Sequence, residues 1–218
     1  SNIVPATWWE AGVGLTTYLH DGFSVDVAVH SGLNTPTAGG NAFKIRNGRQ
    51  KVAKADADQG AVTGRLQWTG MPGVELATTI QYQQDVTQDN FAERISATLF
   101  EAHADIQRGP FGLRALYARW DLGGNAPKAF GRDEQVGWYV EPSYRFNLDC
   151  GQVGLFVRYN EYDNEAGDSI DSEFAQTNVG VNFWPHPMVV LKADMQFNDD
   201  PGNGIDDEIL NLGIGLQF

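Results

Sequence analysis

The stretch Ile209-Leu-Asn-Leu-Gly-Ile-Gly-Leu-Gln-Phe218 decides the fold, because its side chains alternate strictly in character. One face is wholly apolar and carries Leu210, Leu212, Ile214, Leu216 and Phe218. The other face is small or polar and carries Asn211, Gly213, Gly215 and Gln217. A period of two predicts a β-strand, and an apolar outside with a polar inside is typical of a transmembrane β-barrel. An ordinary β-sandwich edge strand is the alternative, but the small face offers little bulk for a second layer.

The same alternation recurs in about eleven segments along the chain. The segments are Thr7–Tyr18, Phe23–His30, Val62–Thr69, Glu75–Gln83, Phe100–Gln107, Leu113–Asp121, Trp138–Phe146, Val153–Asn160, Asn178–Phe183, Leu191–Phe197 and Ile209–Phe218. Leu113–Asp121 is irregular, since Arg114 and Arg119 fall on opposite faces. This predicts either a β-bulge or an arginine that extends to the membrane interface.

The connections between the segments alternate between short and long. Tight turns such as His20-Asp-Gly22, Gly70-Met-Pro-Gly73 and Trp184-Pro-His-Pro187 are short, whereas Asn34–Gln59, Gly123–Gln135, Asp163–Glu173 and Asn198–Glu208 are long. Transmembrane barrels have short turns on one side and longer loops on the other. The order of the connections therefore favours an antiparallel barrel, in one domain over residues 1–218.

The odd number of segments indicates that the barrel is not complete within these residues. Bacterial single-chain barrels have an even number of strands, and an open sheet would expose unpaired backbone to hydrocarbon. Either the count is wrong by one, or the chain is the C-terminal portion of a longer barrel. We favour the second interpretation and predict that Thr7–Tyr18 does not pair with Ile209–Phe218.

The composition excludes several other classes of protein. The net charge of −13 argues against a nucleic-acid partner, and no run approaches the ~18 apolar residues of a membrane helix. The single cysteine, Cys150, leaves no partner for an internal disulfide. We find no motif for a cofactor, a metal ion or a catalytic nucleophile.

Several stretches resemble the large porins grouped with the phosphate-selective O/P porins. They include Ile45-Arg-Asn-Gly-Arg-Gln-Lys51, Gly112-Leu-Arg-Ala-Leu-Tyr-Ala-Arg119, Trp138-Tyr-Val-Glu-Pro-Ser-Tyr144 and Trp184-Pro-His-Pro-Met-Val-Val-Leu-Lys-Ala-Asp194. The chain is similar to the C-terminal half of such proteins, and its terminal Phe218 resembles the final residue of bacterial outer-membrane proteins. The resemblance implies a barrel of about sixteen to eighteen strands with an aqueous channel, and often a homotrimer. It also implies the bacterial outer membrane, with lipid and lipopolysaccharide as neighbours.

The charged and imidazole side chains of the polar face are the candidate pore-lining residues, because rings of charge set pore selectivity. They are Glu10, Asp26, Arg65, Glu75, Glu101, His103, Asp105, Glu141, Arg145, Arg158, Lys192 and Asp194. The alternative is that each residue only solvates the wall of a water-filled lumen. The seven acids and four bases depart from the cationic lining of phosphate-selective members.

The basic stretch Asn34–Gln59 is long enough to fold into the lumen and constrict it. Its candidate constriction residues are Arg46, Arg49, Lys51 and Lys54, although a solvated loop would have the same composition. We expect a porin for passive diffusion of small hydrophilic solutes, with a modest cation preference if the acids dominate. A phosphate- or anion-selective porin is the alternative.

A barrel enzyme or a structural barrel is the second alternative. Glu101, His103 and Asp105 are the only tempting trio of catalytic groups. They share one strand face, where neighbouring side chains stand about 7 Å apart, so we expect no ready-made triad. We therefore expect no enzymatic activity, and the inward glycines and short polar residues argue against a plugged barrel.

Overall fold

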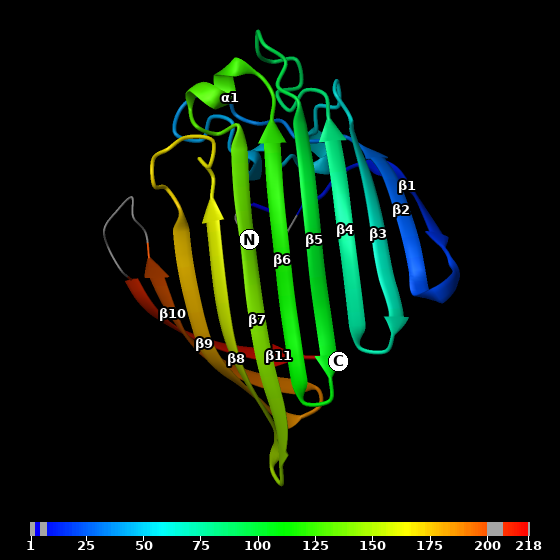
Figure 1. The fold of residues 1–218 in the computed structure, drawn as a ribbon, viewed down its shortest axis with the longest axis vertical. Helices are drawn as coiled ribbons and strands as arrows, with labels where there is room; N and C mark the ends of the chain where they lie inside the picture. Colours follow the sequence, from blue (N-terminus) through cyan, green and yellow to red (C-terminus); the bar gives the residue numbers. More distant parts are fainter. Residues whose placement is uncertain (1–2, 5–7, 200–206, 218) are drawn as a thin grey trace.

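The computed structural model describes residues 3–4, 8–199 and 207–217, and within them the chain is one antiparallel sheet of eleven strands. The strands are β1 (Gly12–Tyr18), β2 (Phe23–His30), β3 (Ala61–Met71), β4 (Val74–Gln83), β5 (Ala97–Arg108), β6 (Phe111–Leu122), β7 (Glu134–Leu148), β8 (Gly151–Asp163), β9 (Phe174–His186), β10 (Val189–Asp199) and β11 (Asp207–Leu216). Each strand pairs with the next along the chain (Figure 1). The all-β prediction is confirmed, whereas Phe218 and most of the Asn198–Glu208 loop lie outside the described residues.

Helical structure is confined to short pieces of the connections. These are η1 (His20–Gly22), η2 (Ile45–Gly48), η3 (Val52–Lys54) and α1 (Asn125–Ala129). In the part of the chain that the structure describes, no helix has the length and apolar character needed to cross a membrane.

The two faces of the sheet differ as the alternation predicts. On the apolar face Val13 is 81% exposed and Leu212 is 76% exposed. The strand register places apolar residues beside apolar ones and polar residues beside polar ones. Val25, for example, pairs with Leu66, and Asp26 pairs with Arg65. A one-residue slip would exchange the faces. The ladders of the described strands shift register near two tight turns, between Trp68 and Met71 and between Val189 and Leu191, and the register between these points fixes one apolar face and one polar face.

Two local predictions are corrected by the strand ladders. β6 pairs without a register shift with both neighbours, so there is no bulge at Leu113–Asp121. Arg119 instead lies near the end of β6, where its Nη2 atom is 2.7 Å from Asp121 and 2.9 Å from Glu134. The predicted turn Trp184–Pro187 is also wrong, because β9 continues through His186 and the turn is at Pro187 and Met188.

The connections sort to the two ends of the sheet as predicted. The longer loops and α1 gather at one end, at the top of Figure 1, and the tight turns lie at the other. The sheet also curls, so that β9, β10 and β11 pass behind β7 in this view. Polar-face residues from β5 to β10 line a common cavity, which places the polar face on the concave side.

The 31–60 connection between β2 and β3 packs onto the polar face instead of standing in solvent. Its side chains Leu33, Phe43 and Ile45 are buried. They join an apolar cluster with Leu99 of β5 and Trp120 of β6. Burying these groups removes apolar surface from water, and it fills the concave side of the sheet near the ends of β5 and β6.

Candidate functional site

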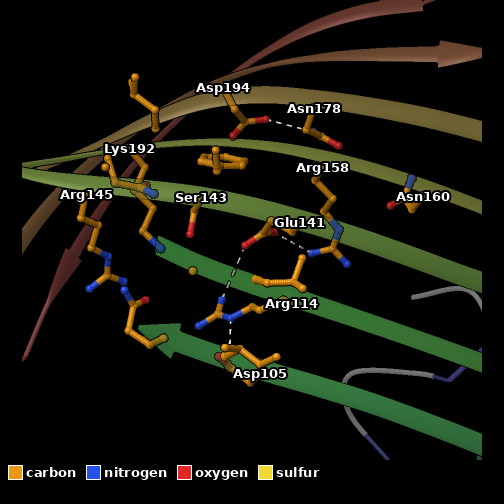
Figure 2. Close-up of a pocket in the computed structure, with 18 of the residues that line it drawn as sticks. Asp105, Arg114, Glu141, Ser143, Arg145, Arg158, Asn160, Asn178, Lys192 and Asp194 are labelled. Atoms are coloured by element: carbon orange, nitrogen blue, oxygen red, sulfur yellow. Dashed lines mark hydrogen bonds and ion pairs between the residues drawn. The ribbon is translucent and has the colours of Figure 1, made fainter. Parts of the chain in front are cut away.

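A cavity of about 510 Å³ lies on the polar face between β5 and β10 (Figure 2). Strand alternation brings charged residues from five strands to its wall. These are Asp105, Arg114, Glu141, Arg145, Arg158, Lys192 and Asp194. Six of them were predicted from the sequence, and Arg114 was left out because the irregular pattern of β6 obscured its face.

A chain of ion pairs crosses the four strands β5 to β8 at the centre of the wall. Arg114 places Nε 3.1 Å from Oδ2 of Asp105 and Nη1 3.9 Å from Oε1 of Glu141. Arg158 places Nη1 3.4 Å from Oε2 of Glu141 (Figure 2). The Arg158 guanidinium also stacks over the Tyr139 ring, at 3.8 Å from the centroid. Four charges thereby neutralise one another within the cavity wall.

Arg145 and Lys192 lie at the end of the cavity near the tight turns. The strand register sets Arg145, Gly154, Asn182 and Lys192 in one row across β7 to β10. The Arg145 guanidinium stacks on the Trp184 indole, at 4.8 Å from the centroid. Among the described residues no carboxylate lies within ion-pair distance of either cation, so no ion pair offsets their charges in the cavity.

The other predicted lining residues form smaller groups toward β1. Asp26 accepts a hydrogen bond from Arg65 at 3.0 Å and one from Thr16 at 2.6 Å. Nδ1 of His103 lies 2.6 Å from Glu101, and its Nε2 lies 3.4 Å from Glu75. The prediction that these side chains stay apart is wrong for Glu101 and His103, because the imidazole bridges the spacing along the strand.

Glu10 does not stand free in the lumen, because its carboxylate holds the base of the 31–60 loop. It accepts hydrogen bonds from Ser31 Oγ at 2.6 Å and from the backbone N–H of Gly32 at 2.5 Å. His30 Nδ1 lies 3.2 Å away. Glu10 is therefore an anchor of the loop.

Three buried glutamines clamp the backbone of this loop. Gln83 bonds both the N–H and the C=O of Leu33 at 2.8 Å, and Gln88 donates to the same carbonyl at 2.8 Å. Gln135 accepts from the N–H of Ile45 at 3.2 Å and donates to the C=O of Phe43 at 2.8 Å. In the sequence, Gln83 looks like ordinary polar lining of a predicted strand, whereas Gln88 and Gln135 fall in predicted connections, so nothing marks their common role.

The four predicted constriction cations do not gather at one point. Arg46 reaches a hollow that it shares with Arg158, Asn160 and Gln176 of the wall. Arg46 also lines a second hollow beside Trp9, together with Arg49 and Lys51, and Lys54 is exposed on η3. Only Arg46 of these four residues thus meets the wall of β8 and β9.

Glu165, in the connection between β8 and β9, ties the loops together at the opposite end from the tight turns. Its Oε1 atom is 2.6 Å from Arg132 and 3.6 Å from Lys44 of the 31–60 loop. Burial alone would raise the pKa of Glu165, but the Arg132 hydrogen bond and the charges of Arg132 and Lys44 hold that pKa below its ordinary value. Glu165 is therefore ionised at neutral pH and fixes the loop to the wall.

Within residues 3–4, 8–199 and 207–217 there is no cluster of three or more histidine, cysteine, aspartate or glutamate side chains able to hold a metal ion. The wall of the polar face carries ion-paired side chains, the two cations Arg145 and Lys192 without an ion-pair partner, and many neutral polar groups.

Comparisons with known proteins agree with this architecture. Residues 5–203 match the Gram-negative porin family. A mutant of the ferric enterobactin receptor from Pseudomonas aeruginosa shares the fold, with 12% identity and a TM-score of 0.50. A second mutant of that receptor matches with 13% identity and a TM-score of 0.46. Each alignment covers 92% of this chain and 38% of the receptor, so the chain spans well under half the length of those proteins. No curated protein matches the sequence.

A curled antiparallel sheet with an apolar outer face and a charged, cavity-bearing inner face is typical of transmembrane β-barrels. With the family match over residues 5–203, the chain belongs to the Gram-negative porin family.

Proposed function

We propose that the polar face lines a water-filled channel in the bacterial outer membrane, through which small hydrophilic solutes and ions diffuse passively. The single observation that carries this proposal is the cavity of about 510 Å³ on the concave polar face, opposite an exposed apolar face. Membership of a porin family further supports a non-enzymatic channel. The apolar face would meet lipid, with lipopolysaccharide beside its loop-bearing rim.

The proposed channel is weakly ion-selective, because Asp105, Arg114, Glu141 and Arg158 neutralise one another in its wall. A permeating ion would meet only a small residual field, which salt screens beyond about 10 Å at 0.1 M. The expected modest cation preference rested on a charge count that omitted Arg114. The corrected inward count is less acidic.

An anion-selective porin is the second candidate, and the unpaired cations Arg145 and Lys192 favour it. The cavity wall holds the four bases Arg114, Arg145, Arg158 and Lys192 against the three acids Asp105, Glu141 and Asp194. This excess is small, and it supports a slight anion preference. A phosphate-specific site of the O/P type would need a denser group of cations.

We further infer that strands additional to these eleven complete the barrel. In the described parts of the chain, β1 pairs with β2 alone and β11 with β10 alone. Unpaired edges in hydrocarbon would leave backbone groups without partners, at a cost of several kcal/mol each. The resemblance to barrels of about sixteen to eighteen strands supports strands on both edges.

Current recordings across planar bilayers test the proposal with the native protein. We expect an ohmic conductance that rises in proportion to the potassium chloride concentration, and a reversal potential close to zero under a salt gradient. Replacing both unpaired cations, Arg145→Gln with Lys192→Gln, should shift the reversal potential toward cation preference. Lys128→Gln, on exposed α1, is the matched control and should leave it unchanged.

An absence of conductance would refute the channel. A strong anion preference would favour the second candidate, and the double variant should then abolish it.

A further inference from the structure

Carboxamide side chains gather on the polar face of β8 to β11, beside the ion-paired part of the wall. Asn160 and Gln176 are register neighbours, as are Asn178 and Gln196. Including those in the adjacent rows, the group comprises Asn160, Gln176, Asn178, Asn182, Gln196 and Asn211. Arg158, Lys192 and Asp194 share these rows, and Asp194 offsets one of the two positive charges, so this part of the wall is strongly polar with a small net charge.

Hydrogen bonds hold these carboxamides in fixed orientations. Asn160 donates to Oε1 of Gln176 at 3.1 Å, and Gln176 donates to Asn198 at 2.9 Å. Asp194 accepts from Asn178 at 3.1 Å and from Asn211 at 3.0 Å. Each carboxamide has two N–H donors and an oxygen with two lone pairs, so one or two such bonds leave further donors and acceptors for a solute.

An aromatic ring lies beside the same group of residues. A Cβ atom on Gly180 would come within 2.4 Å of Cε1 and Cζ of Phe156, so the Phe156 ring packs against the Gly180 backbone. Phe156 is only partly buried and lines the cavity. Glycine at position 180 therefore leaves room for an aromatic ring at the cavity wall.

We propose that the inner wall of β8 to β11 binds neutral, polyhydroxylated solutes such as sugars as they pass through the channel. A sugar hydroxyl both donates and accepts a hydrogen bond, as a carboxamide does, and the C–H face of a sugar ring packs on an aromatic face. The neighbouring Glu141–Arg158 pair is already neutralised and adds little attraction for an ion. This inference rests on the proposed channel and names a solute class for it.

Blocking of the channel current by a sugar tests the inference. Single channels of the native protein are recorded in potassium chloride while sucrose, a neutral disaccharide, is titrated. Polyethylene glycol of the same hydrodynamic size is titrated in parallel. We expect sucrose to reduce the current along a saturating curve, because it occupies a site. Polyethylene glycol should reduce the current only in proportion to the viscosity.

Two sets of variants locate the site. Asn178→Leu with Gln196→Met keeps the side-chain size and removes the carboxamides, so we expect the half-saturating sucrose concentration to rise about tenfold. Phe156→Ala should also raise the half-saturating sucrose concentration, because it removes the aromatic ring on which the sugar packs. Val157→Ala, one residue away on the apolar face, is the matched control and should leave it unchanged.

The outcomes separate the two proposals. A channel that conducts ions but responds identically to sucrose and polyethylene glycol would overturn the sugar site and leave the channel intact. Saturable block that persists unchanged in both sets of variants would also overturn this location. A protein that conducts nothing would refute the channel and the sugar site with it.

Discussion

Glu165 ties loops together through its charge. Its lowered folded pKa means that its stabilisation is complete above the ordinary pKa of glutamate and is lost as the pH falls through the lowered value. We predict that Glu165→Gln lowers the free energy of unfolding by about 1–2 kcal/mol at pH 7, discounted for partial exposure. The difference should vanish in strong acid. Denaturant unfolding followed by tryptophan fluorescence at several pH values measures both effects.

Glu173 provides the control for this prediction, because it belongs to the same connection and its surroundings shift its pKa in the opposite direction. Burial and the nearby Glu161 carboxylate raise the pKa of Glu173. Glu173→Gln should therefore leave stability at pH 7 unchanged or slightly higher. If Glu165→Gln were as stable as the native protein at pH 7, the tether would have no energetic role.

Individual contacts were the least predictable level of this structure. The sequence placed Glu101 and His103 on one face, but the 2.6 Å contact between them depends on rotamers that no pattern records. Arg114 was missed because its strand carries a second arginine, Arg119, on the other face. The second arginine is explained by its ion-pair partners, Asp121 of the same strand and Glu134 of β7.

At the scale of elements, the strands were predictable and the 31–60 loop was not. Strand alternation is local, so the face of a residue such as Leu212 follows from its immediate neighbours. The placement of the loop instead depends on Gln135, which bonds Ile45 from 90 positions away in the sequence. Its burial also depends on Phe43 and Ile45, two apolar residues within a stretch that looks polar and basic.

The glutamine clamp gives a prediction for the loop as an element. Gln135→Met preserves the size of the side chain and leaves the Ile45 N–H and the Phe43 carbonyl without this partner. We expect a loss of about 2–4 kcal/mol in loop stability, seen as frequent brief closures in single-channel recordings and faster proteolysis between residues 31 and 60. Gln152→Met, whose side chain bonds Asn147 near the opposite end of the sheet, should show neither effect.

If Gln135→Met showed no additional channel closures and unchanged proteolysis between residues 31 and 60, this would contradict the clamp. The loop would then be held mainly by its apolar contacts with the cluster around Trp120.

At the scale of the whole molecule, the inside-out pattern of the sequence predicted the architecture that the structure shows. Eleven meandering strands, sorted connections and an exposed apolar face all follow from the period of two. The curl of the sheet agrees with the predicted barrel. The cavity between β5 and β10 did not follow, because it depends on side chains from six strands meeting in space.

The central claim is that the polar face is the wall of a conducting channel, and cysteine modification during current recording tests it most directly. The exposed native thiol is first removed by Cys150→Ser. Single cysteines are then placed on the polar face, at Asp26, Arg65, Arg158, Asn182 and Asn211. Matched cysteines are placed on the apolar face, at Val27, Leu66, Val157, Val181 and Leu212.

A membrane-impermeant thiol reagent is added while the current through each variant is recorded. The structure predicts a stepwise loss of current for the polar-face cysteines, because the attached group occupies the lumen, and no change for the apolar-face set. Loss of current at Val157 or Val181, with none at Arg158 or Asn182, would contradict the account, since the two faces of the sheet would then be exchanged.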